Sequence, residues 1–252
     1  SVRKAHLDAT HGYFNGTSVF LRVHGADDAP CAVTLAKPEG STYAAWRVAT
    51  TLPRVSGDAL EFGNFQASDY DELIDCPVEM GTFVHAEFEA GGIPHEVALT
   101  GVFDVDLERL CADLKVICEE HLDRMGTPSD LDRYLFQIMV VGSGYGGLEH
   151  KTSTSLICSR DDLPRKGEEK ISDGYRTLLA LSSHEYFHLW NVKRIKPARF
   201  TPFDLSQESH TTLLWAFEGF TSYYEPLALV RCGLIDRKSW LELMGRKLTD
   251  VM

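Results

Sequence analysis

The sequence predicts an α+β fold, in which an N-terminal all-β domain at residues 1–104 precedes a mainly helical domain with a small sheet at residues 105–252. Three observations predict it. Short β-like runs separated by turn signals fill the first part of the chain. From Asp106 onward, apolar residues recur at helical spacing. The 252 residues are 44% hydrophobic and 25% charged, which is typical of globular proteins with a sizeable core.

Three runs in the first part of the chain predict strands, at residues 18–23, 83–88 and 95–99. The first run is followed by a glycine and two aspartates, and the second by a pair of glycines. Both combinations favour tight turns. Strands that alternate with tight turns predict the all-β domain.

A long helix is predicted over residues 106–126, because leucines and an isoleucine recur on one of its faces. Asp106 suits the N-cap position and Gly126 the C-terminal stop. Two strands follow, at residues 134–142 and 153–158, with a glycine-rich segment between them. Together these two strands predict the small sheet.

Three further helices are predicted after the charged, loop-like stretch 159–173. They cover about residues 175–191, about residues 211–231, and a segment that starts at Asp236 and still runs at Met252. Because the apolar face of the last helix repeats up to its end, we expect the chain to be cut from a longer protein. The N-terminus has neither an initiator methionine nor an apolar signal-peptide region, so we expect the chain to be cut at this end as well.

Charge and apolar patterning exclude several classes of function. The chain has 25 lysines and arginines against 37 aspartates and glutamates, and this formal net charge of -12 disfavours binding to nucleic acid or to an anionic bilayer. No apolar run reaches the roughly 18 residues of a membrane-spanning helix. The six cysteines form no Cys-x-x-Cys pair, which favours reduced core thiols. We expect a cytoplasmic location, with the periplasm as the alternative, and the oligomeric state stays open.

The strongest functional signal is the run from His184 to His188, a His-Glu-x-x-His motif inside an apolar helical pattern. Histidines four residues apart lie on one helical face, so both imidazoles can bind one metal ion. Glu185 can reach a water molecule on that metal and act as general base. The alternative, two histidines that pack on an amphipathic helix, gives no reason for the carboxylate between them.

A catalytic zinc site takes three protein ligands, so a third side chain has to come from another segment. Glu218 fits best, because it lies among aromatic residues of a predicted helix, where an unpaired carboxylate would be costly to bury. Glu208 and His210 are alternatives, but they precede the apolar helix and are expected to face solvent. Glu225 lies two turns further on and better suits a hydrogen bond to a ligating histidine.

Two runs resemble the signature of the glycyl-aminopeptidase zinc metallopeptidases, gluzincins that usually carry a later PDZ domain. They are residues 183–197, which read SHEYFHLWNVKRIKP, and residues 214–224, which read LWAFEGFTSYY. Further similarity lies at residues 1–8, 13–17 and 69–81, so the resemblance spans essentially the whole chain.

The resemblance implies that the second domain is a thermolysin-like catalytic domain and that the protein is a hydrolase, a metalloprotease with aminopeptidase activity. It implies Zn²⁺ as the cofactor, with His184, His188 and Glu218 as ligands and Glu185 as the general base. One departure is Lys196, where an arginine is expected, although the positive charge is kept.

A second candidate site is the segment 144–150, GYGGLEH, whose glycines let an edge strand lie close to an extended peptide. Glu149 could pair with the free α-ammonium group of that peptide, which would select substrates by their N-terminus. The segment resembles the Gly-x-x-Glu motif that aminopeptidases of this clan use to hold the substrate, with Gly146 and Gly147 beside the peptide. The alternative is a glycine hairpin with Glu149 in solvent.

These motifs predict zinc-assisted hydrolysis of a peptide substrate. A preference for N-terminal glycine or alanine follows from the resemblance alone. Two alternatives stay open: an endopeptidase that uses the same metal, and a catalytically silent peptide-binding fragment that lacks the groups stabilising the tetrahedral intermediate. Tyr223 and Tyr224 are local candidates for that stabilising role, and the residue that the family uses is expected beyond Met252.

Overall fold

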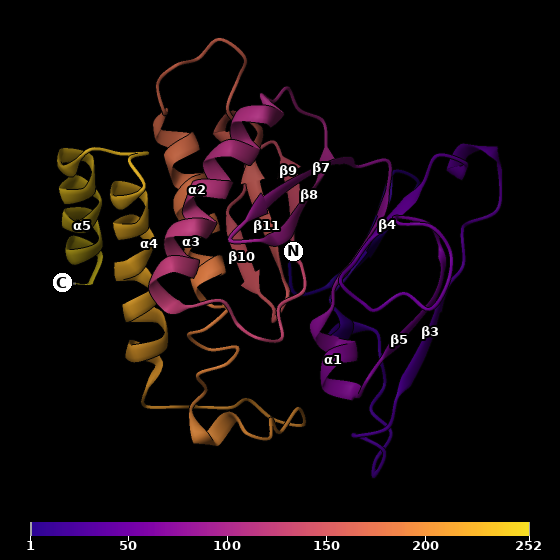
Figure 1. Cartoon of the computed structure of the whole chain (residues 1–252). Helices are drawn as coiled ribbons and strands as arrows, with labels where there is room; N and C mark the ends of the chain where they lie inside the picture. Colours follow the sequence, from indigo (N-terminus) through magenta and orange to yellow (C-terminus); the bar gives the residue numbers. More distant parts are fainter. Residues whose placement is uncertain (1, 252) are drawn as a thin grey trace. The chain divides into compact units, whose positions relative to one another are not determined.

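The protein has the α+β class that the sequence predicts, because strands dominate the chain up to Gly101 and helices dominate it from Leu107 onward (Figure 1). The computed structural model describes residues 2–251, so the end of the predicted last helix at Met252 lies outside the described residues. The chain forms two compact units that interleave along the sequence. The first unit comprises Ser1–Glu87, Pro94–Phe103 and Asp132–Arg160, and the second comprises Phe88–Ile93, Asp104–Leu131 and Asp161–Met252. The domain boundary between residues 104 and 105 stays a prediction.

The first part of the first unit contains two antiparallel sheets and a short helix. A four-stranded sheet has the order β1-β2-β6-β4, and a two-stranded sheet joins β3 to β5. Phe65, Leu73 and Val78 are buried together in the core of this part. The elements are β1 (Ala5–Leu7), β2 (His11–Phe14), β3 (Cys31–Leu35), β4 (Arg47–Ala49), β5 (Gly63–Ala67), α1 (Tyr70–Asp75) and β6 (Val78–Gly81).

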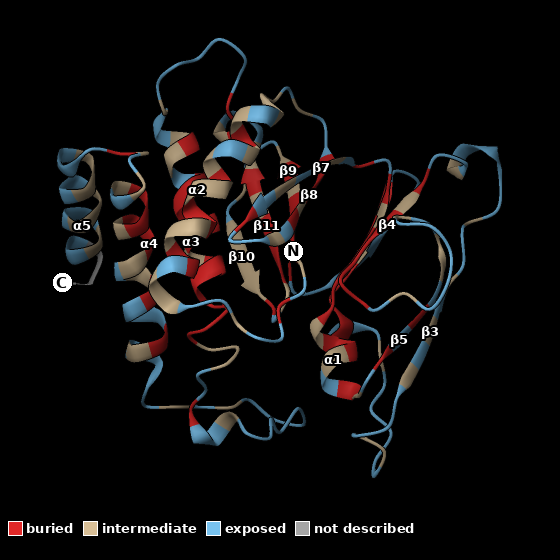
Figure 2. Ribbon diagram, in the orientation of Figure 1, coloured by how far each residue is buried: buried red, intermediate tan, exposed pale blue. Residues whose placement is uncertain are grey.

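A five-stranded sheet has the order β10-β11-β9-β8-β7. Strands β8, β9 and β11 run parallel to one another, whereas β10 pairs with β11 antiparallel and forms an edge of the sheet. Parallel strands read as nearly continuous apolar runs when both of their faces are covered, and most of β9 is buried (Figure 2). The strands are β7 (Val84–Ala90), β8 (Ile93–Gly101), β9 (Tyr134–Val141), β10 (Gly146–Glu149) and β11 (Ser153–Ser159).

Two expectations about the strands need correction. The strand predicted at residues 18–23 is wrong, because the Asn15 side chain accepts a hydrogen bond from the Thr17 backbone and caps a 3-10 turn at Gly16–Ser18. The predicted small sheet is larger than expected, because β7 and β8 join it rather than the sheets of the preceding part. Parallel pairing of β8 with β9 requires a long crossover connection, which the intervening α2 provides.

In the part of the chain that the structure describes, the second unit contains four α-helices, and α3 packs against both α2 and α4, with α5 beside α4 (Figure 1). Asp106 caps α2 by accepting a hydrogen bond from the Arg109 backbone, and Gly126 follows its last residue, as predicted. Among the described residues, no helix combines the length and the apolar character that crossing a membrane requires. The helices of this unit are α2 (Leu107–Met125), α3 (Asp173–Phe187), α4 (Phe220–Arg231) and α5 (Arg237–Val251), with a π-helix at Trp215–Gly219 and a 3-10 turn at Ala198–Phe200. The 3-10 turn at Ser41–Tyr43 belongs to the first unit, and the one at Arg160–Asp162 lies where the chain passes from the first unit into the second.

His121 of α2 makes the stability of the second unit sensitive to pH. Its ring is 1% exposed, and it forms a hydrogen bond of 2.8 Å with Ser183 of α3. Burial, with a smaller contribution from the charge on Arg124, lowers the pKa of His121 to about 3 from 6.5. Between these two pH values the unfolded chain binds a proton that the folded protein does not, so the free energy of unfolding falls as the pH falls below 6.5.

We expect this effect to cost about 2 kcal/mol of stability between pH 7 and pH 5, since each pKa unit corresponds to about 1.4 kcal/mol. Urea unfolding of the wild type and of His121→Gln at both pH values measures it. The difference in free energy of unfolding between the two proteins should shrink by this amount at pH 5. An unchanged difference would show that residue 121 already takes up its proton in the folded protein.

Candidate metal centre

Helix α3 presents both histidines of the His-Glu-x-x-His motif. Ser172 caps the start of α3, and the helix ends at Phe187, so His188 is its C-cap residue. His184 and His188 therefore lie one turn apart, with their Nε2 atoms 3.1 Å from each other. Glu185 lies beside His184 on the same helix and is only 5% exposed.

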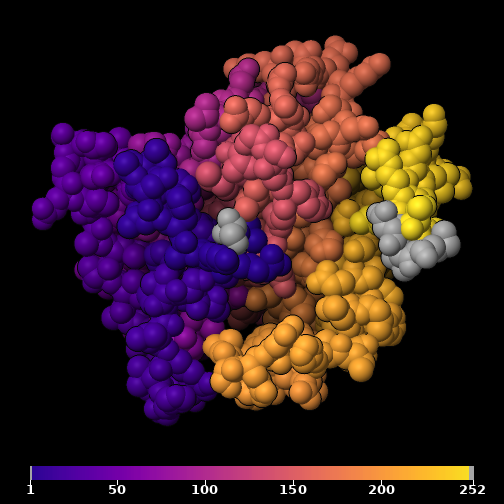
Figure 3. Space-filling model, turned by 180° about the vertical axis from the view of Figure 1, so that it is seen from behind, coloured from indigo at the N-terminus to yellow at the C-terminus, as the bar shows by residue number. Residues whose placement is uncertain are grey.

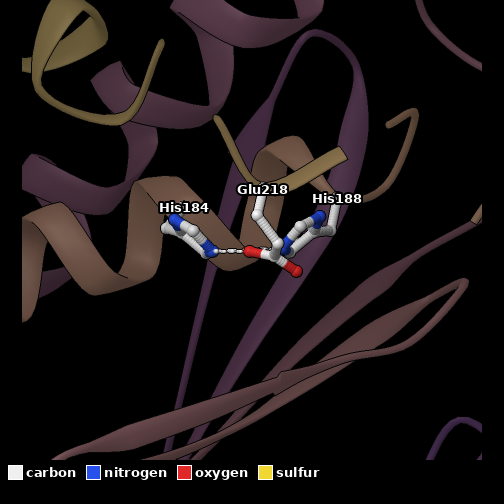
Figure 4. Close-up of side chains that lie close together, drawn as sticks. All are labelled: His184, His188 and Glu218. Carbon is white, nitrogen blue, oxygen red and sulfur yellow. Dashed lines mark hydrogen bonds and ion pairs between the residues drawn. The ribbon is translucent and has the colours of Figure 1, made fainter. Parts of the chain in front are cut away.

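Glu218 reaches the two histidines from the π-helical turn Trp215–Gly219 (Figure 4). Its Oε2 atom lies 3.4 Å from His184 Nε2 and 3.8 Å from His188 Nε2. Ligand atoms about 2.0 to 2.2 Å from a tetrahedral zinc ion lie roughly 3.3 to 3.6 Å from one another. The three side chains that the sequence singles out as ligands thus come together at spacings close to those of a zinc site.

The second nitrogen of each imidazole is held by an outer partner. His184 Nδ1 donates to Glu225 Oε2 at 3.1 Å, and His188 Nδ1 donates to the backbone carbonyl of Asn191 at 2.8 Å. Because Nδ1 is the donor in both rings, the Nε2 lone pairs point toward each other and toward Glu218. Acceptor atoms that face each other in this way need a proton or a cation between them. Two imidazoles and a carboxylate form a set of ligands that fits zinc.

The charge around the cluster also favours a cation. Burial alone would lower the pKa of His184, but its hydrogen bonds to Glu218 and Glu225 outweigh this and raise the pKa to about 10. Glu185 contributes in the same direction. The carboxylates that stabilise a positive charge on this ring would stabilise a divalent ion at the same place. The Glu218 side chain is half exposed, so a water molecule or a substrate carbonyl can reach the cluster.

The alternative ligands lie elsewhere. Glu208 and His210 are both exposed and lie 3.9 Å from each other, in the stretch between α3 and α4 that Figure 3 shows in orange at the surface of the second unit.

Tyr223 and Tyr224 are the local candidates for stabilising the tetrahedral intermediate. Tyr224 stacks on Phe187, with ring centroids 5.0 Å apart, as expected for a packing residue. Tyr223 is partly exposed.

Strand β10 carries the predicted peptide-binding residues in the first unit. Gly146 and Gly147 pair with Ile157 and Leu156 of β11, and Glu149 is the last residue of this edge strand. The structure thus provides the predicted edge strand with glycines, while the position of Glu149 relative to the histidines stays a prediction.

Asp75 anchors the turn that follows β10, a role that the sequence did not indicate. Its carboxylate accepts a hydrogen bond of 2.7 Å from the Lys151 backbone and lies 3.3 Å from His150 Nδ1. His150 is buried, because its ring packs into this turn beside a carboxylate. The two contacts fix the end of β10 immediately after Glu149.

Comparisons with known proteins found two family models and a solved structure that match this chain. The model of the M61 glycyl aminopeptidase family matches residues 177–252, and that of the M61 N-terminal domain matches residues 1–82. A crystal structure of an aminopeptidase N family protein from Idiomarina loihiensis is 44% identical in sequence, with a TM-score of 0.94. The match covers 97% of this chain and 41% of the other, so the chain spans less than half the length of that protein.

A search of the curated proteins found no match. The two family models nevertheless cover both the β-rich start of the chain and the helices that carry His184, His188 and Glu218. The chain therefore belongs to the M61 glycyl-aminopeptidase family of peptidases.

Proposed function

We propose that the protein is a zinc-dependent aminopeptidase that removes small N-terminal residues, glycine or alanine, from peptides. The observation that carries the proposal is the convergence of His184, His188 and Glu218, with each imidazole Nδ1 held by an outer hydrogen-bond partner. The membership in the M61 family supports the substrate preference. The endopeptidase and the silent peptide-binding fragment are the alternatives that the experiment below tests.

In this proposal each residue near the cluster has a defined task. Zinc bound by His184, His188 and Glu218 would lower the pKa of a water molecule and polarise the scissile carbonyl. Glu185 accepts the proton of that water and passes it to the leaving amine, which is general base and then general acid catalysis. Its burial limits contact between the carboxylate and bulk water.

The β10 strand has the complementary task of holding the substrate. An extended peptide can add to the edge of a sheet through backbone hydrogen bonds, and glycines at positions 146 and 147 allow close approach. The carboxylate of Glu149 at the end of β10 would pair with the α-ammonium group of the peptide.

We expect the wild type to cleave glycyl and alanyl anilides far better than their N-acetylated forms, which lack the α-ammonium charge. Glu149→Ala should lower kcat/KM for the free amines by about 10- to 100-fold, the cost of one charge-assisted hydrogen bond of roughly 1.5 to 3 kcal/mol. The control is Glu87→Ala, which removes an exposed carboxylate from β7 of the same sheet and should have no effect.

Equal cleavage of free and acetylated substrates would contradict the aminopeptidase proposal and favour the endopeptidase. Binding of both forms with cleavage of neither would favour the silent peptide-binding fragment.

A further inference from the structure

We propose that Asn191 is a positioning residue that holds the two halves of the zinc site in register, and the inference rests on the ligand set of the proposed function. The halves are the end of α3 with its histidines, and the π-helical turn that carries Glu218. Asn191 lies three residues after His188 and is 9% exposed. It contacts both halves, one through its backbone and the other through its side chain.

The side-chain amide of Asn191 is bound to the segment around Glu218. Its Nδ2 atom donates to the carbonyl oxygens of Ala216 and Phe217 at 3.2 Å and 3.1 Å, and it lies 3.2 Å from Thr221 Oγ1. Ala216 and Phe217 are the two residues immediately before Glu218. Three acceptors around one NH₂ group fix the position of the turn that presents the carboxylate.

The backbone of Asn191 is bound to the end of α3. Its carbonyl accepts the hydrogen bond from His188 Nδ1, and its N–H donates to the Phe187 carbonyl at 3.2 Å. The first of these bonds sets the tautomer and the orientation of a ligating ring. The distance between His188 and Glu218 therefore depends on the geometry of one residue that is bonded to both sides.

The chemistry of this position requires an asparagine. An aspartate of the same size would point oxygens at the two carbonyls, and alanine or serine would be too short to reach them. Without the amide, the π-helical turn would lose its hydrogen bonds to Asn191, and the carbonyl oxygens of Ala216 and Phe217 would lose a donor. Zinc tolerates only small changes in ligand distance, so the metal affinity should report this loss.

The test compares zinc affinity, measured by competition with a chromophoric chelator, in the wild type and in Asn191→Ala. We expect the affinity to fall by about 10- to 100-fold, which is the usual cost of removing an outer partner of a metal ligand. The visible absorption of the Co²⁺ form should change as well, because it reports ligand geometry. Tyr175→Phe is the control, since it removes a partly buried hydrogen bond, from Tyr175 to Asp113, at the other end of α3.

Thr221→Val is a second variant, which keeps the shape of the side chain and removes the oxygen next to the Asn191 amide. It should also weaken zinc binding, by less than Asn191→Ala. The inference is overturned if both variants bind zinc as the wild type does, with an unchanged Co²⁺ spectrum, even if their melting temperatures fall as that of Tyr175→Phe does. It falls together with the proposed function if the wild type binds no zinc. A wild type that binds zinc but cleaves no glycyl or alanyl substrate would contradict only the proposed function.

Discussion

Replacement of Glu185 by glutamine should leave zinc bound and reduce kcat by at least about 100-fold, the lower end for loss of a general base. Glutamine keeps the size of the side chain but accepts no proton at neutral pH. Because the two side chains are equal in size, the change should keep both imidazoles in their positions at the end of α3. Steady-state kinetics on a glycyl anilide, together with the zinc content per chain, measure both parts of the expectation.

The control for Glu185 is Glu119→Gln, which removes the charge of a partly exposed carboxylate on α2 and should preserve kcat. If Glu185→Gln lost its metal but kept its activity per bound zinc, Glu185 would be a ligand. The role assigned to Glu218 would then be in question as well.

Glu218→Ala should have the largest effect on the metal itself. It removes the only carboxylate of the proposed ligand set and leaves two imidazoles, where a catalytic zinc site takes three protein ligands. We expect the zinc affinity to fall by more than the roughly 10- to 100-fold that loss of an outer partner costs, with activity falling in parallel at limiting zinc. Chelator competition measures the affinity.

Glu225→Gln provides the comparison for Glu218→Ala, because Glu225 bonds His184 Nδ1 rather than facing the cluster centre. Its effect on zinc affinity should be the smaller of the two. The reverse order would assign Glu225 to the metal and Glu218 to the outer position.

Elements with local end signals could be predicted from the sequence. Helix α2 begins after Asp106 and ends before Gly126, because the signals for both ends lie within one turn of the ends themselves. The strand predicted at residues 18–23 is wrong because the prediction used only its apolar residues. It missed the local signal of Asn15, which caps a 3-10 turn at Gly16–Ser18. The joining of β8 to β9 depends on pairing across a crossover of about thirty residues, which local patterns do not contain.

In the candidate site, too, local features could be predicted from the sequence and contacts between distant segments could not. His184 and His188 are recognisable because their spacing on one helix is a local property. The hydrogen bonds of Asn191 join segments 25 to 30 residues apart, and nothing in the neighbouring sequence indicates them. The π-helical turn was also not predicted, because the residues at Trp215–Gly219 read equally well as an ordinary α-helix.

The π-helical turn limits how the length of this helix can change during evolution. A π-turn holds one residue more than an α-turn, so deletion of one residue at Trp215–Gly219 would allow a regular helix to form. That deletion would change the position of Glu218 relative to Glu225, because Glu218 lies inside the turn that would tighten. One-residue gaps should therefore be absent from this turn among active homologues, whereas the exposed stretch at residues 201–208 should accept insertions and deletions.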